Sequence, residues 1–171
     1  GCNLRCHWCD TPYTSWKPEM QEQHLGPILA NVRRHWGVEH VVVTGGEPMI
    51  MPDIVALAGT LKANGHHVTI ETAATVFKPM PLDLASLSPK LSNSTPWDRE
   101  GGRFAAAHER QRINVSVIQQ FIDGSPDFQL KFVVSDERDL SEIQSLLEQL
   151  KHWEPSDVLL MPEGVDATTL D

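Results

Sequence analysis

Residues 40–65, HVVVTGGEPMIMPDIVALAGTLKANG, contain the pattern that decides the fold. The β-branched run at 40–43 predicts a buried strand, and it ends abruptly at TGGEP (44–48), which predicts a tight loop. Apolar residues at helical spacing follow, and Gly65 is suited to end that helix. The stretch therefore predicts one strand, loop and helix unit.

The same alternation recurs along the rest of the chain. Strands that alternate with amphipathic helices imply an α/β protein with a parallel sheet and right-handed crossovers. Residues 92–105 carry Pro, paired Gly and charges without a period, which predicts an excursion or mobile loop. The expected strands lie at 40–43, 67–70, 84–87, 128–134 and 158–161, and the expected helices around 25–36, 54–61, 113–121 and 140–150.

Unusual polar residues fall where the expected strands end. In parallel β/α folds the C-terminal ends of the strands meet at one rim and carry the chemistry. We therefore expect a functional site at that rim. Its candidates are Thr44 to Glu47, Glu71, Ser88 to Lys90, and Glu163.

The composition limits the functions that the chain can have. At 171 residues with 40% apolar composition, the length suits one domain with an ordinary core. Fourteen basic against 23 acidic residues give a formal charge of -9, which disfavours binding to nucleic acid or to an anionic membrane. No run approaches the ~20 apolar residues that span a bilayer, and no secretory signal is evident. The default expectation is a cytoplasmic protein.

Three cysteines, Cys2, Cys6 and Cys9, lie near the start of the chain, and there is no fourth. Three thiols in one segment indicate a metal or redox site and cannot form a disulfide framework. A structural zinc ion requires four ligands, commonly from two Cys-x2-Cys pairs, and only one such pair is present. His7 is an awkward fourth ligand because it is tethered closely between Cys6 and Cys9.

An iron–sulfur cluster accounts better for three thiolates. An electron-transfer [4Fe-4S] cluster is normally held by four cysteines, so three leave one iron atom without a protein ligand. That open iron is useful when a substrate or cofactor completes its coordination, as at the open position of a catalytic zinc site. The cysteine spacing therefore favours a cluster that takes part in chemistry.

The spacing Cys-x3-Cys-x-aromatic-Cys, in which Trp8 is the aromatic residue, resembles the radical S-adenosylmethionine (SAM) superfamily. The sequence is similar in particular to the 7-carboxy-7-deazaguanine synthase (QueE) family. This resemblance implies a partial, incomplete parallel β/α barrel of the radical SAM type, formed by alternating βα units. Four further motifs carry it: CDTPYT at 9–14, TGGEP at 44–48, SPK at 88–90 and MPEG at 161–164.

The resemblance implies a role for the cysteine segment. Cys2, Cys6 and Cys9 would hold a [4Fe-4S] cluster whose open iron is chelated by the amino and carboxylate groups of SAM. The main chain of Trp8, Cys9 and Asp10 would reach the adenine.

Two further motifs would complete the SAM site. Gly45, Gly46 and Glu47 would receive the methionine amino group, the glycines by close backbone approach and the carboxylate as an acceptor. Ser88, Pro89 and Lys90 match another SAM-contacting segment of the family.

By the same resemblance, Thr11 would be a magnesium ligand, with substrate and water completing the shell of Mg2+. Thr44 and Glu71 would face the bicyclic substrate, and the carboxylate would accept from its pyrimidine N–H groups. The implied substrate is 6-carboxy-5,6,7,8-tetrahydropterin, from which a 5′-deoxyadenosyl radical removes a hydrogen at C6. Ring contraction and loss of ammonia give 7-carboxy-7-deazaguanine, in queuosine and 7-deazapurine biosynthesis. The radical chemistry belongs to the cofactors, so no side chain is assigned a catalytic role.

The implied partners are the pterin, an electron donor such as flavodoxin or ferredoxin, and a second copy of the chain in a homodimer. The chain starts at Gly1 and lacks the family segments before the cysteines and after MPEG. We therefore expect residues 1–171 to form a single radical SAM domain that is truncated at both ends. Ala73 and Ala74 stand where relatives commonly have glycine, which predicts a rearranged or mildly strained loop if Ala74 needs a positive φ.

Two other functions stay open at this point. Another small radical SAM enzyme, such as an activase that places a glycyl radical on a partner, would share the cysteines, although Cys9-Asp10-Thr11 argues against it. A non-catalytic module could bind an iron–sulfur cluster or zinc for structure or electron transfer.

Overall fold

The computed structural model describes residues 1–19, 23–35 and 37–164. One sheet of five parallel strands, in the order β1-β2-β3-β4-β5, forms its framework. Strands that are neighbours along the chain are neighbours in the sheet, as in a β/α barrel, and the sheet does not close within the described residues. The strands are β1 (His40–Val43), β2 (His67–Thr72), β3 (Leu84–Leu87), β4 (Phe128–Val134) and β5 (Val158–Pro162).

The predicted parallel α/β fold is confirmed, and each expected strand is present to within two residues. The helices differ more. Residues 92–105, predicted as a loop, contain two short 3-10 turns and lead into a helix, α3, that the sequence pattern missed because it has no apolar stripe of its own. Trp36, placed in the first predicted helix, lies outside the described residues. The helices are α1 (Leu25–Arg33), α2 (Ile54–Ala63), α3 (Ala105–Gln111), α4 (Val115–Gly124) and α5 (Arg138–Leu147).

Local signals in the sequence mark the start of one of these helices and the end of another. The Asn114 side chain accepts a hydrogen bond from the Val117 N–H and so caps the start of α4. After α2, Gly65 adopts a φ of 86°, the left-handed conformation that glycine accepts without strain. The chain can then reverse into β2.

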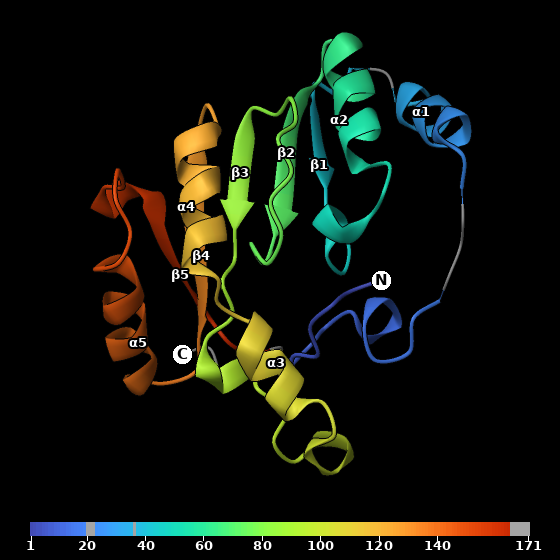
Figure 1. The fold of residues 1–171 in the computed structure, drawn as a ribbon. Coiled ribbons are helices and arrows are strands. Elements are labelled where there is room, and N and C mark those ends of the chain that lie inside the picture. Colours follow the sequence, from blue (N-terminus) through green and yellow to red (C-terminus); the bar gives the residue numbers. More distant parts are fainter. Residues whose placement is uncertain (20–22, 36, 165–171) are drawn as a thin grey trace.

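The main core lies between the sheet and the helices that cover it. Figure 1 shows α2, α4 and α5 running alongside the strands. Strand residues such as Ile70, Leu130 and Phe132 are buried against Ile118 and Phe121 of α4. Burying each such side chain contributes about 1.5–3 kcal/mol. This packing fixes the strand ends at the rim where polar residues gather.

The segment with the three cysteines crosses the rim at the C-terminal ends of the strands. In Figure 1 the arrowheads of β2 and β3 point toward this blue segment, and α3 lies beside it. No helix among the described residues is long and apolar enough to span a membrane.

The loop after β2 has the positive φ at Ala74 that was the stated condition for a strained loop. Ala74 has a φ of 54°, and its N–H donates to the Thr72 hydroxyl at 3.0 Å. Its methyl group is fully buried. An L-residue in the left-handed region carries about 1–2 kcal/mol of strain.

Replacing Ala74 by glycine should change the free energy of unfolding by less than about 1 kcal/mol, because relief of strain offsets the lost methyl group and the greater freedom of unfolded glycine. Ala58→Gly, at an equally buried position in α2, has no strain to relieve and should cost about 2 kcal/mol. Urea unfolding compares the two variants. Equal losses of stability would contradict strain at Ala74.

Candidate functional site

A cavity of about 490 Å³ opens at the C-terminal rim of the sheet. Its walls come from the cysteine loop, defined as residues 1–15, and from residues within or just after the five strands. Every residue that the sequence predicted for the site lines this cavity, except Glu47, Pro89 and Glu163. The structure therefore brings together residues that are up to 88 positions apart, from Cys2 to Lys90.

The three cysteines are free thiols on the wall of this cavity. Among the described residues, no three His, Cys, Asp or Glu side chains converge as ligands of one metal ion would. Three thiols on one wall of a cavity are donors that suit a cubane cluster, because its iron atoms occupy separate corners and each cysteine would bind a different one. The donor set therefore fits a [4Fe-4S] cluster with one open iron.

Burial changes the acidity of these thiols. It raises the pKa of Cys6 to about 12, and it also raises the pKa of Cys2. A thiol binds metal as the thiolate, so loading the site with metal must release protons. Ser15, which the sequence did not indicate, lies beside Cys9 with its Oγ 3.2 Å from the cysteine Sγ.

The loop after β1 touches the cysteine loop through its backbone. A side chain at Gly46 would meet the Gly1 carbonyl oxygen at 2.5 Å and the Cys2 Cβ at 2.7 Å, so only glycine fits. The Glu47 N–H donates to the same Gly1 oxygen at 3.0 Å. Gly46 is therefore required for this close approach of the two backbone segments.

The Glu47 side chain is not among the residues that line the cavity, and its predicted contact with an ammonium group stays a prediction. Only 1% of Glu47 is exposed, and burial raises the pKa of its carboxyl group. The carboxylate accepts from the Met49 N–H at 3.0 Å, the Thr72 hydroxyl at 2.7 Å and the Ala73 N–H at 2.9 Å. It therefore joins the loop after β1 to the end of β2.

A charged pair lies on the opposite wall. Lys131, from β4, contacts the Glu71 carboxylate with an N–O distance of 2.6 Å, and the Thr44 hydroxyl donates to the other oxygen at 3.1 Å. The hydrogen bond from Lys131 holds the pKa of Glu71 below its usual value, so the carboxylate is ionised at neutral pH. Sequence analysis missed Lys131. A lone lysine inside the apolar strand FQLKFVV was the available signal.

Lys90 is the second lysine of the cavity. Its Nζ donates to the Ser88 hydroxyl at 2.7 Å and lies 5.5 Å from the centre of the Trp8 ring. Burial lowers the pKa of Lys90, while the nearby Cys6 and Cys2 oppose that change. Two of the three residues in the predicted SPK segment thus face the cavity, and Pro89 does not.

Thr11 and Asp10 lie on the wall formed by the cysteine loop. Thr11 precedes the short 3-10 turn Pro12–Thr14, and its carbonyl accepts from the Thr14 hydroxyl at 2.8 Å. Its own hydroxyl is 3.7 Å from the Cys9 Sγ. A hydroxyl in this place can act as one ligand of a cation that takes its other ligands from water or substrate.

Comparisons with known proteins agree with this geometry. The sequence profile of the Radical SAM superfamily matches residues 1–90. The whole chain aligns with two proteins named 7-carboxy-7-deazaguanine synthase. The one from Halobacterium salinarum is 44% identical over 180 residues, with 70% of its length covered, and the one from Rhodopirellula baltica is 46% identical over 171 residues, with 66% covered.

Solved structures show the same fold. The crystal structure of QueE from Escherichia coli superposes with a TM-score of 0.65 at 25% identity, over 99% of this chain and 73% of that one. Streptococcus suis SuiB bound to S-adenosylmethionine also superposes with a TM-score of 0.65, at 15% identity over 99% of this chain and 40% of that one, which supports the fold alone. The chain belongs to the radical SAM superfamily and, within it, to the 7-carboxy-7-deazaguanine synthase family.

Proposed function

We propose that this chain converts 6-carboxy-5,6,7,8-tetrahydropterin to 7-carboxy-7-deazaguanine and ammonia. One observation carries the proposal: a single cavity has the three thiols on one wall and the Thr44, Glu71 and Lys131 group on another. A substrate bound between these walls would lie next to the cofactors, as a reaction within one enclosed site requires. When bound, the cluster and SAM supply the radical chemistry.

The residues of the chain hold and orient these groups. Cys2, Cys6 and Cys9 would bind three iron atoms and leave the fourth facing the cavity. The backbone of Gly45 and Gly46 would accept the methionine ammonium group, because both residues line the cavity. The contact of that group with the Glu47 carboxylate stays a prediction. Ser88 and Lys90 would contact SAM, and the main chain of Trp8 to Asp10 would contact the adenine.

The charges on the substrate wall suit a pterin. The Glu71 carboxylate, kept ionised by Lys131, would accept from the N–H groups of the pyrimidine ring. Thr44 holds that carboxylate in place and would face the same ring. The fixed geometry of these groups would orient the ring so that its reacting carbon faces the cofactors.

The finer assignments complete the proposal. Thr11 would provide one ligand of Mg2+, with the substrate carboxylate and water providing others. Flavodoxin or ferredoxin would donate the electron, in the cytoplasm. A homodimer is consistent with the edges of the sheet, where Val42 of β1 and Leu160 of β5 expose apolar side chains.

Anaerobic incubation with dithionite, SAM, Mg2+ and the carboxylated tetrahydropterin tests the proposal. We expect 7-carboxy-7-deazaguanine, ammonia and 5′-deoxyadenosine, identified by mass spectrometry, and no deazaguanine from Cys6→Ala. Formation of 5′-deoxyadenosine without deazaguanine would indicate another radical SAM enzyme, such as an activase. Uptake of zinc with an intact fold, and no cluster, would favour a non-catalytic module.

The Glu71 and Lys131 pair predicts a pH effect. Lys131 lowers the pKa of Glu71, so Lys131→Met should raise that pKa toward or above its usual value of 4.5. As the pH falls, the variant should therefore lose kcat/KM for the pterin at a higher pH than the wild type does. Glu71→Gln, which removes the charged acceptor, should lower kcat/KM about 10- to 100-fold at neutral pH.

The double variant provides the control for this pH effect. Without an ionisable group at position 71, adding Lys131→Met should no longer move the acid side of the pH profile. A shift of the same size in the Glu71→Gln background would show that Lys131 acts on another group. Cluster content, measured as iron per chain, should be equal in all four proteins.

Thr11→Ala should retain the cluster but need about 10-fold more Mg2+ for half-maximal product formation, because it removes one ligand of the ion. Thr14→Ala, in the same turn, keeps the Thr11 hydroxyl and should retain the wild-type dependence on Mg2+. The measurement is a titration of product formation with Mg2+. An unchanged titration curve for Thr11→Ala would remove Thr11 from the proposal.

A further inference from the structure

Residues 92–108, here called the cradle, contact the cysteine loop at several points. The Trp8 indole N–H donates to the Asn93 side-chain oxygen at 3.3 Å. The His7 N–H donates to the Ser94 carbonyl at 2.6 Å, and the Arg99 guanidinium donates to the His7 carbonyl at 2.7 Å. The cradle is therefore a support for the cysteine loop and differs from the free excursion that its composition suggested.

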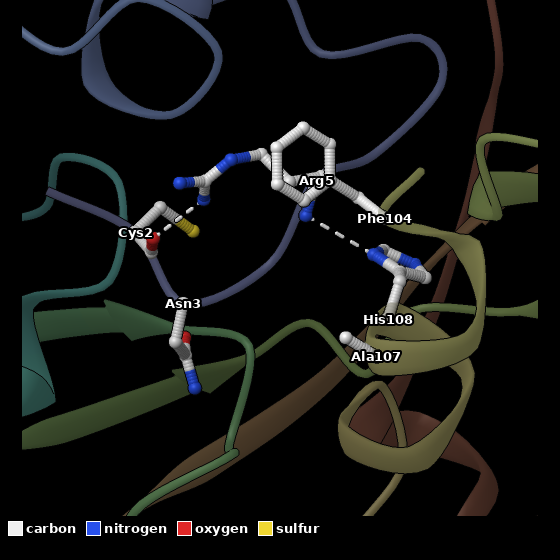
Figure 2. Close-up of a pocket in the computed structure, with 6 residues that line it drawn as sticks. All are labelled: Cys2, Asn3, Arg5, Phe104, Ala107 and His108. Carbon is white, nitrogen blue, oxygen red and sulfur yellow. Dashed lines mark hydrogen bonds between the residues drawn. The ribbon is translucent and has the colours of Figure 1, made fainter. Parts of the chain in front are cut away.

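His108, a buried residue of the cradle, also contacts the cysteine loop. Figure 2 shows its ring beside the cysteine loop, with a dashed line from the Arg5 backbone nitrogen to the ring. The Arg5 N–H donates to Nδ1 at 3.1 Å. Only 2% of His108 is exposed, and a small cavity of about 130 Å³ lies between Cys2, Arg5, Phe104 and the ring.

The second ring nitrogen identifies the tautomer. The Ser94 hydroxyl donates to the Leu91 carbonyl at 2.6 Å, so its proton is engaged there. The Ser94 Oγ must then accept from Nε2, which lies 2.9 Å away. Nε2 carries the proton, and Nδ1 presents a lone pair to Arg5. Burial lowers the pKa of His108 to about 4, which agrees with this neutral ring.

These contacts surround Cys6 in particular. Arg5 precedes Cys6 and donates to His108, whereas His7 follows it and donates to Ser94. The Cys6 carbonyl itself accepts from the Trp16 indole at 2.9 Å. The peptide groups 4–5 and 6–7, which lie on either side of Cys6, are therefore held from outside the cavity, and this limits the freedom of the Cys6 side chain to change direction.

We propose that His108, backed by Ser94, is a positioning residue that fixes Cys6 for binding of the iron–sulfur cluster. The inference rests on the proposed function in that it requires a cluster on the three cysteines. A histidine is suited to this role because one rigid ring accepts from the loop and donates to the cradle at the same time. The contact reaches Cys6 only through the backbone, so His108 itself binds no iron.

The test compares five variants with the wild type after anaerobic reconstitution with ferrous iron and sulfide. His108→Ala should lose iron to a chelator about 10- to 100-fold faster than the wild type, as expected when support of a ligand is removed. The electron paramagnetic resonance signal of its reduced cluster should broaden. His108→Asn can place an oxygen near the position of Nδ1 and should restore most of the retention, whereas His108→Gln, which reaches Ser94 but not Arg5, should not.

Ser94→Ala provides a second route to the same contact. It removes the acceptor for Nε2 but keeps the Ser94 carbonyl that binds His7. It should therefore speed iron loss by a smaller factor than His108→Ala does. Iron retention equal to the wild type in both His108→Ala and Ser94→Ala would overturn the proposal.

Leu146→Ala, a cavity substitution in the core under α5, separates positioning from general stability. It should lower the melting temperature of the metal-free protein at least as much as His108→Ala while iron loss stays at the wild-type rate. If the rate of iron loss rises in step with the decrease in melting temperature in both variants, the positioning role is overturned. A wild-type protein that takes up no iron and sulfide would overturn the proposed function and, with it, this inference.

Discussion

The site depends on one buried carboxylate, that of Glu47. A charge with 1% exposure persists only where donors surround it, and here two backbone N–H groups and the Thr72 hydroxyl do so. Its own N–H donates to the Gly1 carbonyl. One residue thus joins the loop after β1, the end of β2 and the start of the cysteine loop. Each donor left without an acceptor would cost about 1–3 kcal/mol, so the three segments hold one another in a single arrangement.

The charges of the cavity follow from that arrangement. Lys90 is half-buried near Cys6 and Cys2, and these groups act on each other: a thiolate favours the charged lysine, and the charged lysine favours the thiolate. Lys131 is paired with Glu71. One lysine of the cavity therefore lies near the thiols, and the other compensates the charge of a carboxylate.

The sequence predicted the framework well because each strand has a local signal, a short apolar run that stops at polar residues such as Thr44 or Ser88. It also identified many of the residues that line the cavity, since parallel strands bring their C-terminal ends together. It failed at helix α3, which lacks an apolar stripe, and at His108, which has no ligand spacing. Lys131 does have a local signal, a lone lysine in an apolar strand, but it was not singled out. The sequence does not reveal the three donors that already surround the Glu47 carboxylate, so it could not show whether that carboxylate is free to accept from an ammonium group.

These omissions share a physical cause. The cysteine loop has only one 3-10 turn of its own, so its shape is set by partners far along the chain: Thr75 for Asn3, Asn93 for Trp8 and His108 for Arg5. Closing such long loops costs entropy that only the folded core can offset. The spacing of three cysteines identifies the cluster, but it does not determine the directions in which the thiolates point. Those directions depend on distant residues that belong to no motif. The geometry of the site therefore depends on the whole fold.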